Sequence, residues 1–85
     1  MNCLEGCIIE KGVYIGTGSW TIDQFRVTGG QNECSSRCAL TNKCVAWTYK
    51  VSDLYCWLNS DDSSKGQSDG WITGTKACGS TGNYQ

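Results

Sequence analysis

Proline and histidine are absent from this chain of 85 residues, and aliphatic residues are scarce. Leu, Ile, Val and Phe together occupy only fourteen positions, which is a low share for a chain that must bury a hydrophobic core. Without histidine, the chain lacks the usual general base and the usual activator of serine and cysteine nucleophiles. We therefore expect a protein that is not an enzyme and that uses no cofactor.

Runs of like charge and long apolar stretches are also missing. The seven basic and eight acidic residues are scattered along the chain, and the net charge is only -1. A nucleic-acid-binding surface needs clustered Lys and Arg, and a transmembrane helix needs about eighteen consecutive apolar residues. We expect neither nucleic-acid binding nor membrane insertion.

Cysteine, by contrast, is abundant. Such a density in a short chain predicts a disulfide framework, which persists in oxidising compartments. The odd number leaves at least one thiol without an intramolecular partner. No apolar signal-peptide core follows the first residues, so we expect an extracellular piece of a longer secreted chain. The seven cysteines are Cys3, Cys7, Cys34, Cys38, Cys44, Cys56 and Cys78.

β-Forming residues, turn residues and one helical pattern predict a single small α+β domain. We expect the domain to span residues 1–78, with its core in 7–78, and residues 79–85 to form a linker or frayed tail. The polar tract 60–70 is expected to be a loop. The expected strands are short segments within 8–27, then 45–51, 54–59 and 71–77.

One helix is expected at about residues 31–41. Thr28 and Gln31 have the spacing of a capping box, and Asn42 is a suitable left-handed stop. Cys34 and Cys38 are four residues apart, so they lie on one face of this helix. Bridged Cα atoms lie within about 7 Å of each other.

Under that limit, Cys38 most easily reaches Cys44, just past the end of the helix. Cys34 lies one turn earlier and would reach deeper into the sheet, where Cys56 lies. A zinc site at these four cysteines is the alternative, but the chain has no Cys-x2-Cys knuckle.

Two further sites would use the acidic loop. Asp61 and Asp62 are adjacent carboxylates, but a polar tract favours a solvated loop over a catalytic pair. The same stretch faintly resembles a calcium-binding loop, yet Lys65 occupies a ligand position and Ile72 stands where the bidentate Glu belongs. We expect no metal and no catalytic residue.

Tryptophan supplies the best candidates for binding, because exposed aromatic rings stack on sugars and anchor protein interfaces. Trp47 and Trp57 lie on expected strands in a domain poor in aliphatic residues, so core packing is the favoured interpretation. Trp20 and Trp71 flank turns or loops and are candidate binding residues.

Three basic residues surround the corner between the helix and the strand after it. Arg37, Lys43 and Lys50 are candidates for holding an anionic glycan. A plain solvated surface is the simpler interpretation of the same pattern.

Several motifs, in this order, together resemble the PAN/Apple family. The run from Glu33 to Tyr49 is similar to the family's helix with two cysteines followed by Cys-x-Ala-aromatic-Thr-Tyr. Residues 10–16, 56–58 and 68–76 resemble its first strand, its Cys-x-Leu strand and its closing segment. The resemblance covers about residues 7 to 78 and is closest to apple modules of microneme adhesive proteins from apicomplexan parasites such as Eimeria.

The resemblance implies a five-stranded antiparallel sheet that cradles the helix. It also implies the bridges Cys34–Cys56 and Cys38–Cys44, and an outer bridge that ties the two ends of the domain together. Cys7 is nearer than Cys3 to the first strand, so Cys7 is the better partner for Cys78. Cys3 would then be free, paired to another module, or in competition with Cys7 for Cys78.

Members of this family bind proteins or carbohydrates and have no catalytic role. The resemblance therefore implies a microneme-secreted adhesion module, one unit of a tandem array, that binds a host-cell surface protein or glycan during attachment and invasion. One alternative is an assembly module that contacts sister modules or another parasite protein. Another is a small secreted protease inhibitor that inserts the loop 60–70, although no cysteine or proline pins that loop.

Overall fold

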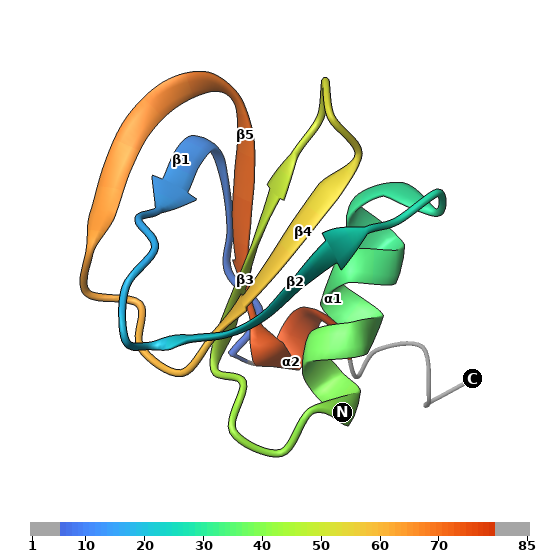
Figure 1. Ribbon diagram of the computed structural model, residues 1–85, viewed down its shortest axis with the longest axis vertical. Coiled ribbons are helices and arrows are strands. Elements are labelled where there is room, and N and C mark those ends of the chain that lie inside the picture. The colour runs from blue at the N-terminus through green and yellow to red at the C-terminus, as the bar shows by residue number, and fades with distance from the viewer. Residues whose placement is uncertain (1–5, 80–85) are drawn as a thin grey trace.

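The computed structural model describes residues 6–79, which fold into one sheet and two helices (Figure 1). Two strands, a helix, three strands and a short helix follow one another along the chain, and the last strand is the longest. In chain order the elements are β1 (Ile9–Ile15), β2 (Thr21–Arg26), α1 (Gly30–Leu40), β3 (Ala46–Lys50), β4 (Tyr55–Asn59), β5 (Lys65–Thr75) and α2 (Lys76–Gly79).

The sheet has five strands in the order β1-β5-β3-β4-β2. Every pairing in it is antiparallel. The strand order makes β1 and β2 the two edge strands. Helix α1 packs against one face of the sheet, and α2 lies beside the end of α1 (Figure 1). The expected α+β fold with a five-stranded antiparallel sheet is confirmed.

Helix α1 lies within one residue of its expected position at both ends, but neither predicted terminal signal is used. The N-cap is Gly29 and makes no side-chain cap bond; instead the Glu33 carboxylate accepts the Gly29 backbone N–H at 2.7 Å. At the other end, the Thr41 hydroxyl donates to the Arg37 carbonyl at 2.7 Å. Because that carbonyl is satisfied, the helix needs no left-handed residue, and Asn42 is not one.

The prediction of a loop over residues 60–70 is wrong from Lys65 onward. Residues 65–67 pair with residues 13–15 of β1, and this half of β5 curves with β1 away from the other strands (Figure 1). Since it pairs with an edge strand alone, most of its side chains face water, and the resulting polar composition resembles that of a loop. The real irregular segment is residues 60–64.

The end of the last strand also differs from the prediction. Strand β5 stops at Thr75, and Lys76–Gly79 forms the short helix α2, which the sequence pattern did not indicate. Gly79, expected to begin a linker, belongs to this helix, where an added Cβ would collide with the Ser35 carbonyl. Residues 80–85 lie outside the described residues.

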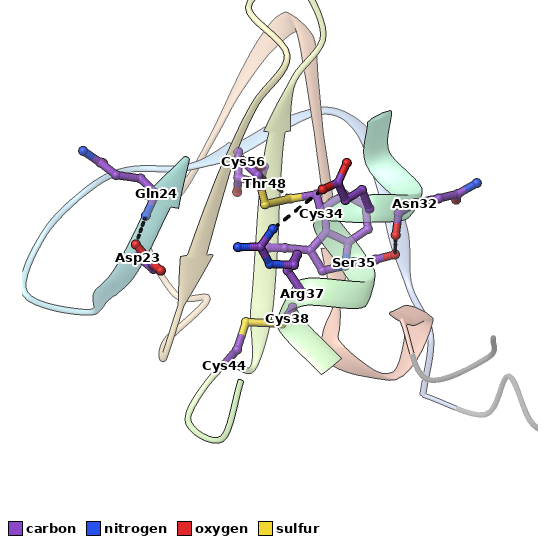
Figure 2. The surroundings of a disulfide bond; sticks show 12 residues. Asp23, Gln24, Asn32, Cys34, Ser35, Arg37, Cys38, Cys44, Thr48 and Cys56 are labelled. Carbon is purple, nitrogen blue, oxygen red and sulfur yellow. Dashed lines mark hydrogen bonds and ion pairs between the residues drawn. A yellow bond between two sulfur atoms is a disulfide. The ribbon is translucent and has the colours of Figure 1, made fainter. Parts of the chain in front are cut away.

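The core lies between α1 and the sheet and depends on sulfur. Trp47 and Leu58 are the largest fully buried side chains there, and six cysteines complete the layer. Figure 2 shows two bridges from α1: Cys34–Cys56, with Cα atoms 5.5 Å apart, and Cys38–Cys44, 5.3 Å apart. Disulfides and two large side chains thus replace the aliphatic residues that the composition lacks.

The third bridge, Cys7–Cys78, joins the segment before β1 to α2, with Cα atoms 4.6 Å apart. The two bridges of α1 are the pairings that the family resemblance implies. Cys7–Cys78 is the outer bridge that the position of Cys7 favours. Cys3, whose fate was left open, lies outside the described residues. The four central cysteines are held in disulfides, so they do not form a thiolate set for zinc.

Candidate functional site

The alternation of side chains along the strands gives the sheet two different faces. Tyr49, Cys56 and Leu58 face α1 and are buried. Lys50 is registered beside Tyr55 on β4 and beside Trp71 on β5, so these three residues lie on the opposite face. We call that face, away from α1, the outer face.

Four aromatic rings meet on the outer face. We call Tyr14, Tyr55, Trp57 and Trp71 the outer aromatic cluster. The ring centroids are 5.3 Å apart for Tyr14–Trp71, 5.4 Å for Trp57–Trp71 and 4.9 Å for Tyr55–Trp57. The rings are tilted against each other by 39° to 54°, and each is partly exposed. The cluster is therefore continuous across β1, β5 and β4.

Small residues beneath the cluster make room for its large rings. Thr48 stands between Trp57 and Thr73 in the strand register, and the two threonines are almost fully buried. On the outer strand pair, Gly66 lies opposite Tyr14, and a Cβ added there would sit 2.5 Å from the tyrosine hydroxyl oxygen. The positions of the tyrosine and tryptophan rings thus depend on side chains that are small or absent.

A chain of hydrogen bonds fixes the end of β1 over the outer face. The Ile15 backbone N–H donates to Thr48 Oγ1 at 3.1 Å, and Thr73 Oγ1 donates to the Val13 carbonyl at 2.8 Å. The two hydroxyl oxygens are 3.0 Å apart. Since Thr73 has used its only hydroxyl hydrogen, Thr48 is the donor between them, and every member of the chain is satisfied.

The polar atoms of the outer aromatic cluster have no partners within residues 6–79. None of the hydrogen bonds in that range involves Trp57 Nε1, Trp71 Nε1 or the hydroxyls of Tyr14 and Tyr55. The other two tryptophans behave differently. Trp47 Nε1 donates to the Thr75 carbonyl at 3.2 Å and Trp20 Nε1 to the Gly16 carbonyl at 2.7 Å, as buried indoles usually do.

Of the two predicted binding tryptophans, Trp71 belongs to the cluster and Trp20 does not. Trp20 holds the connection between β1 and β2 in place, because its carbonyl also accepts the Ser60 backbone N–H at 2.8 Å. The expectation for Trp47 is confirmed, since it is fully buried. The expectation that Trp57 packs in the core is wrong. Its neighbours Cys56 and Leu58 face α1, so alternation directs Trp57 outward.

The structure does not bring the three candidate basic residues together. Lys50 lies on the outer face, with Nζ 5.3 Å from the Trp71 ring centroid, and pairs with Asp53 at 3.3 Å. Arg37 lies on α1, stacked 4.2 Å over the Phe25 ring and 3.6 Å from the Glu33 carboxylate. Lys43 is exposed before β3, at the opposite end of that strand from Lys50.

Two charged groups outside the cluster have shifted pKa values with local causes. The hydrogen bond from Lys65 to Glu10, 2.8 Å long, raises the pKa of the lysine and joins β5 to β1. The Ser63 backbone N–H donates to Asp61 at 2.8 Å and lowers the pKa of that carboxyl. Asp61 therefore orders the turn before β5, and within residues 6–79 no three metal-binding side chains converge.

No protein-family model matches the chain, and no curated protein matches it either. Neither helix among residues 6–79 is long and apolar enough to cross a membrane. The outer aromatic cluster, with Lys50 beside it, is the surface best equipped for recognition.

Proposed function

We propose that this chain is a PAN/Apple module that acts as a non-catalytic, secreted adhesion domain. It binds a host-cell surface protein or glycan through its outer face, as a unit of a microneme protein of an apicomplexan parasite. The motif resemblance, the α+β fold with one helix on a five-stranded sheet and the three disulfide pairings all support this proposal.

The observation that carries the proposal is that the polar atoms of the outer aromatic cluster have no hydrogen-bond partner within residues 6–79. Tyrosine and tryptophan are enriched at the centres of interfaces because each combines a large apolar ring with one polar atom. In Trp57 and Trp71 the indole N–H has no partner within residues 6–79, so a ligand can accept a hydrogen bond there. Lys50 adds a charge at the edge of the same surface.

The scaffold beneath the cluster favours binding because it is rigid. Tyr55 and Trp57 flank Cys56, whose disulfide to Cys34 fixes β4 to α1. The chain of hydrogen bonds through Thr48 fixes β1 in the same way. A surface that is already ordered loses little conformational entropy on association.

The direct test is binding of the folded, oxidised chain of 85 residues to host-cell monolayers and to a glycan array. We expect the labelled protein to bind cells in a saturable way, and an excess of unlabelled protein to displace it. Binding to a sister parasite protein, with none to cells or glycans, would instead establish the assembly alternative. Absence of binding by oligomers of the chain, in which avidity compensates for weak single contacts, would contradict the proposal.

A further inference from the structure

We infer that the outer aromatic cluster recognises a proline-rich segment in the polyproline II conformation. The inference rests on the proposed function, because it names the chemistry of a protein ligand for the outer face. Three independent properties of the cluster lead to it: its hydrogen-bonding capacity, the tilt of its rings and the charge at its edge.

The cluster offers donors and few acceptors. The indole N–H groups of Trp57 and Trp71 and the Lys50 ammonium can only donate, and the nearby Asp53 carboxylate is already paired with Lys50. A neutral sugar brings a donor with each hydroxyl, and the cluster offers only the hydroxyls of Tyr14 and Tyr55 to accept from it. A polyproline II segment has every carbonyl free, and its prolines have no N–H.

The rings form a ridged apolar surface on which small apolar rings can pack. Neighbouring rings tilt by 39° to 54° with centroids 4.9 to 5.4 Å apart, so they contact each other at an angle and leave no broad flat surface. Aromatic-lined surfaces of this type bind polyproline II segments, which are pre-ordered and therefore lose little entropy on binding. A pyranose stacks best on one open ring face, which tilted neighbours obstruct.

The edge of the cluster is basic. Arg26 and Lys50 are registered on either side of Tyr55, and the exposed Arg26 side chain makes no ion pair or hydrogen bond within residues 6–79. This charge favours a proline-rich segment with an acidic residue at one end. Since these 85 residues contain no proline, a second copy of this domain does not supply such a segment.

The test uses the four indole N–H signals in the ¹⁵N NMR spectrum of the full chain. The probe is an acetylated decaproline peptide ending in two glutamates, with a glycine-serine decapeptide of the same ending as control. We expect the signals of Trp57 and Trp71 to shift in a saturable way with the proline peptide. The signals of Trp20 and Trp47, whose indoles are already paired, should stay in place.

Conservative variants test the hydrogen-bond donors separately from the rings. Trp57→Phe and Trp71→Phe each keep an aromatic ring and remove one indole N–H. Each should lower the affinity for the proline peptide about fivefold to tenfold. Trp20→Phe removes an indole N–H outside the cluster and should leave the affinity unchanged. Retention of the backbone amide spectrum confirms that each variant is folded.

Three results would overturn the inference: no shift with the proline peptide at millimolar concentration, equal shifts with the glycine-serine control, or shifts of Trp57 and Trp71 with a heparin hexasaccharide alone. Cell binding distinguishes the inference from the proposed function. If Trp71→Phe reduces cell binding while the proline peptide does not bind, the outer face remains the adhesion surface and only the ligand is wrong. If the peptide binds but cells do not, the proposed function fails and the inference stands.

Discussion

At the scale of single residues, glycine and threonine decide where the large rings of the outer face lie. Tyr14 rests across Gly66, where an added Cβ would collide with the tyrosine ring. Thr48 and Thr73 are buried under the tryptophans and pair with each other. Their shapes and hydroxyls, which composition does not reveal, set the geometry of the candidate site.

Replacing Gly66 with alanine should disturb the outer aromatic cluster, because Gly66 lies directly beneath the Tyr14 ring. The new Cβ would meet the ring of Tyr14, so we expect Gly66→Ala to lower the free energy of unfolding by about 1–3 kcal/mol and to move the Tyr14 and Trp71 signals. Gly16→Ala is the matched control, since its Cβ would lie 3.8 Å from the nearest atom. Equal denaturant midpoints for the two variants would contradict the close contact.

Asn59 is a polar residue that costs stability. Asn59 is 1% exposed, and neither its side-chain oxygen nor its side-chain nitrogen has a hydrogen-bond partner within residues 6–79. A buried polar group without a hydrogen bond is unfavourable, so an apolar residue of similar shape should be tolerated or better. We expect Asn59→Leu to raise the free energy of unfolding by about 1–2 kcal/mol.

Urea unfolding with the disulfides intact measures this effect, with the exposed Asn42→Leu as the control for added hydrophobicity. A loss of more than about 1 kcal/mol in Asn59→Leu would show that the amide is hydrogen-bonded in solution.

At the scale of elements, the edge strand β2 has features that oppose pairing with a strand of another molecule. The Asp23 carboxylate accepts the Gln24 backbone N–H at 2.9 Å (Figure 2), so that N–H cannot pair with a strand of another molecule. Charged side chains at an edge also oppose edge-to-edge association. β2 is thereby kept from serving as a template for pairing.

Removing this carboxylate should promote self-association. We expect Asp23→Ala to form concentration-dependent dimers in sedimentation analysis at concentrations where the native chain is monomeric. Asp69→Ala removes the same charge from an exposed position on β5 and should remain monomeric. Similar behaviour of the two variants would show that net charge, and not the cap on Gln24, controls association.

The elements differ in how well the sequence predicts them. Helix α1 and strands β3 and β4 follow from residue type and spacing, because half-buried elements carry a clear pattern. The first half of β5 does not, since its polar side chains face water and its pairing with β1 is a long-range contact. The outward position of Trp57 does have a sequence signal, because its neighbours Cys56 and Leu58 alternate with it and face α1.

The sequence contains no signal that the indole N–H groups of Trp57 and Trp71 lack partners within residues 6–79. Whether Trp20, Trp47, Trp57 or Trp71 finds an acceptor depends on which carbonyls the fold brings nearby, such as Gly16 for Trp20. The distinction between structural and available tryptophans therefore needs the structure. The same holds for Arg37, whose stacking on Phe25 joins α1 to β2.

At the scale of the whole molecule, the Cys7–Cys78 bridge joins residues 71 positions apart and so constrains nearly the entire unfolded chain. In the chain-entropy model, such a long loop contributes about 4 kcal/mol. We expect the double variant Cys7→Ser, Cys78→Ser to lose about that amount in urea unfolding while retaining the two bridges of α1. A loss below about 1 kcal/mol would mean that the bridge adds little to the described fold.

Residues 6–79 thus have a sulfur-rich core that holds the fold together and an outer aromatic cluster that we propose for recognition. The most direct test of this division compares cell binding by two double variants. Trp57→Phe with Trp71→Phe alters the outer face, and Arg37→Gln with Lys43→Gln alters the basic residues away from it. We predict at least a tenfold loss of affinity for the first pair, from two lost hydrogen bonds, and native affinity for the second. Native binding by the tryptophan variant together with a loss in the Arg37 and Lys43 variant would contradict the account.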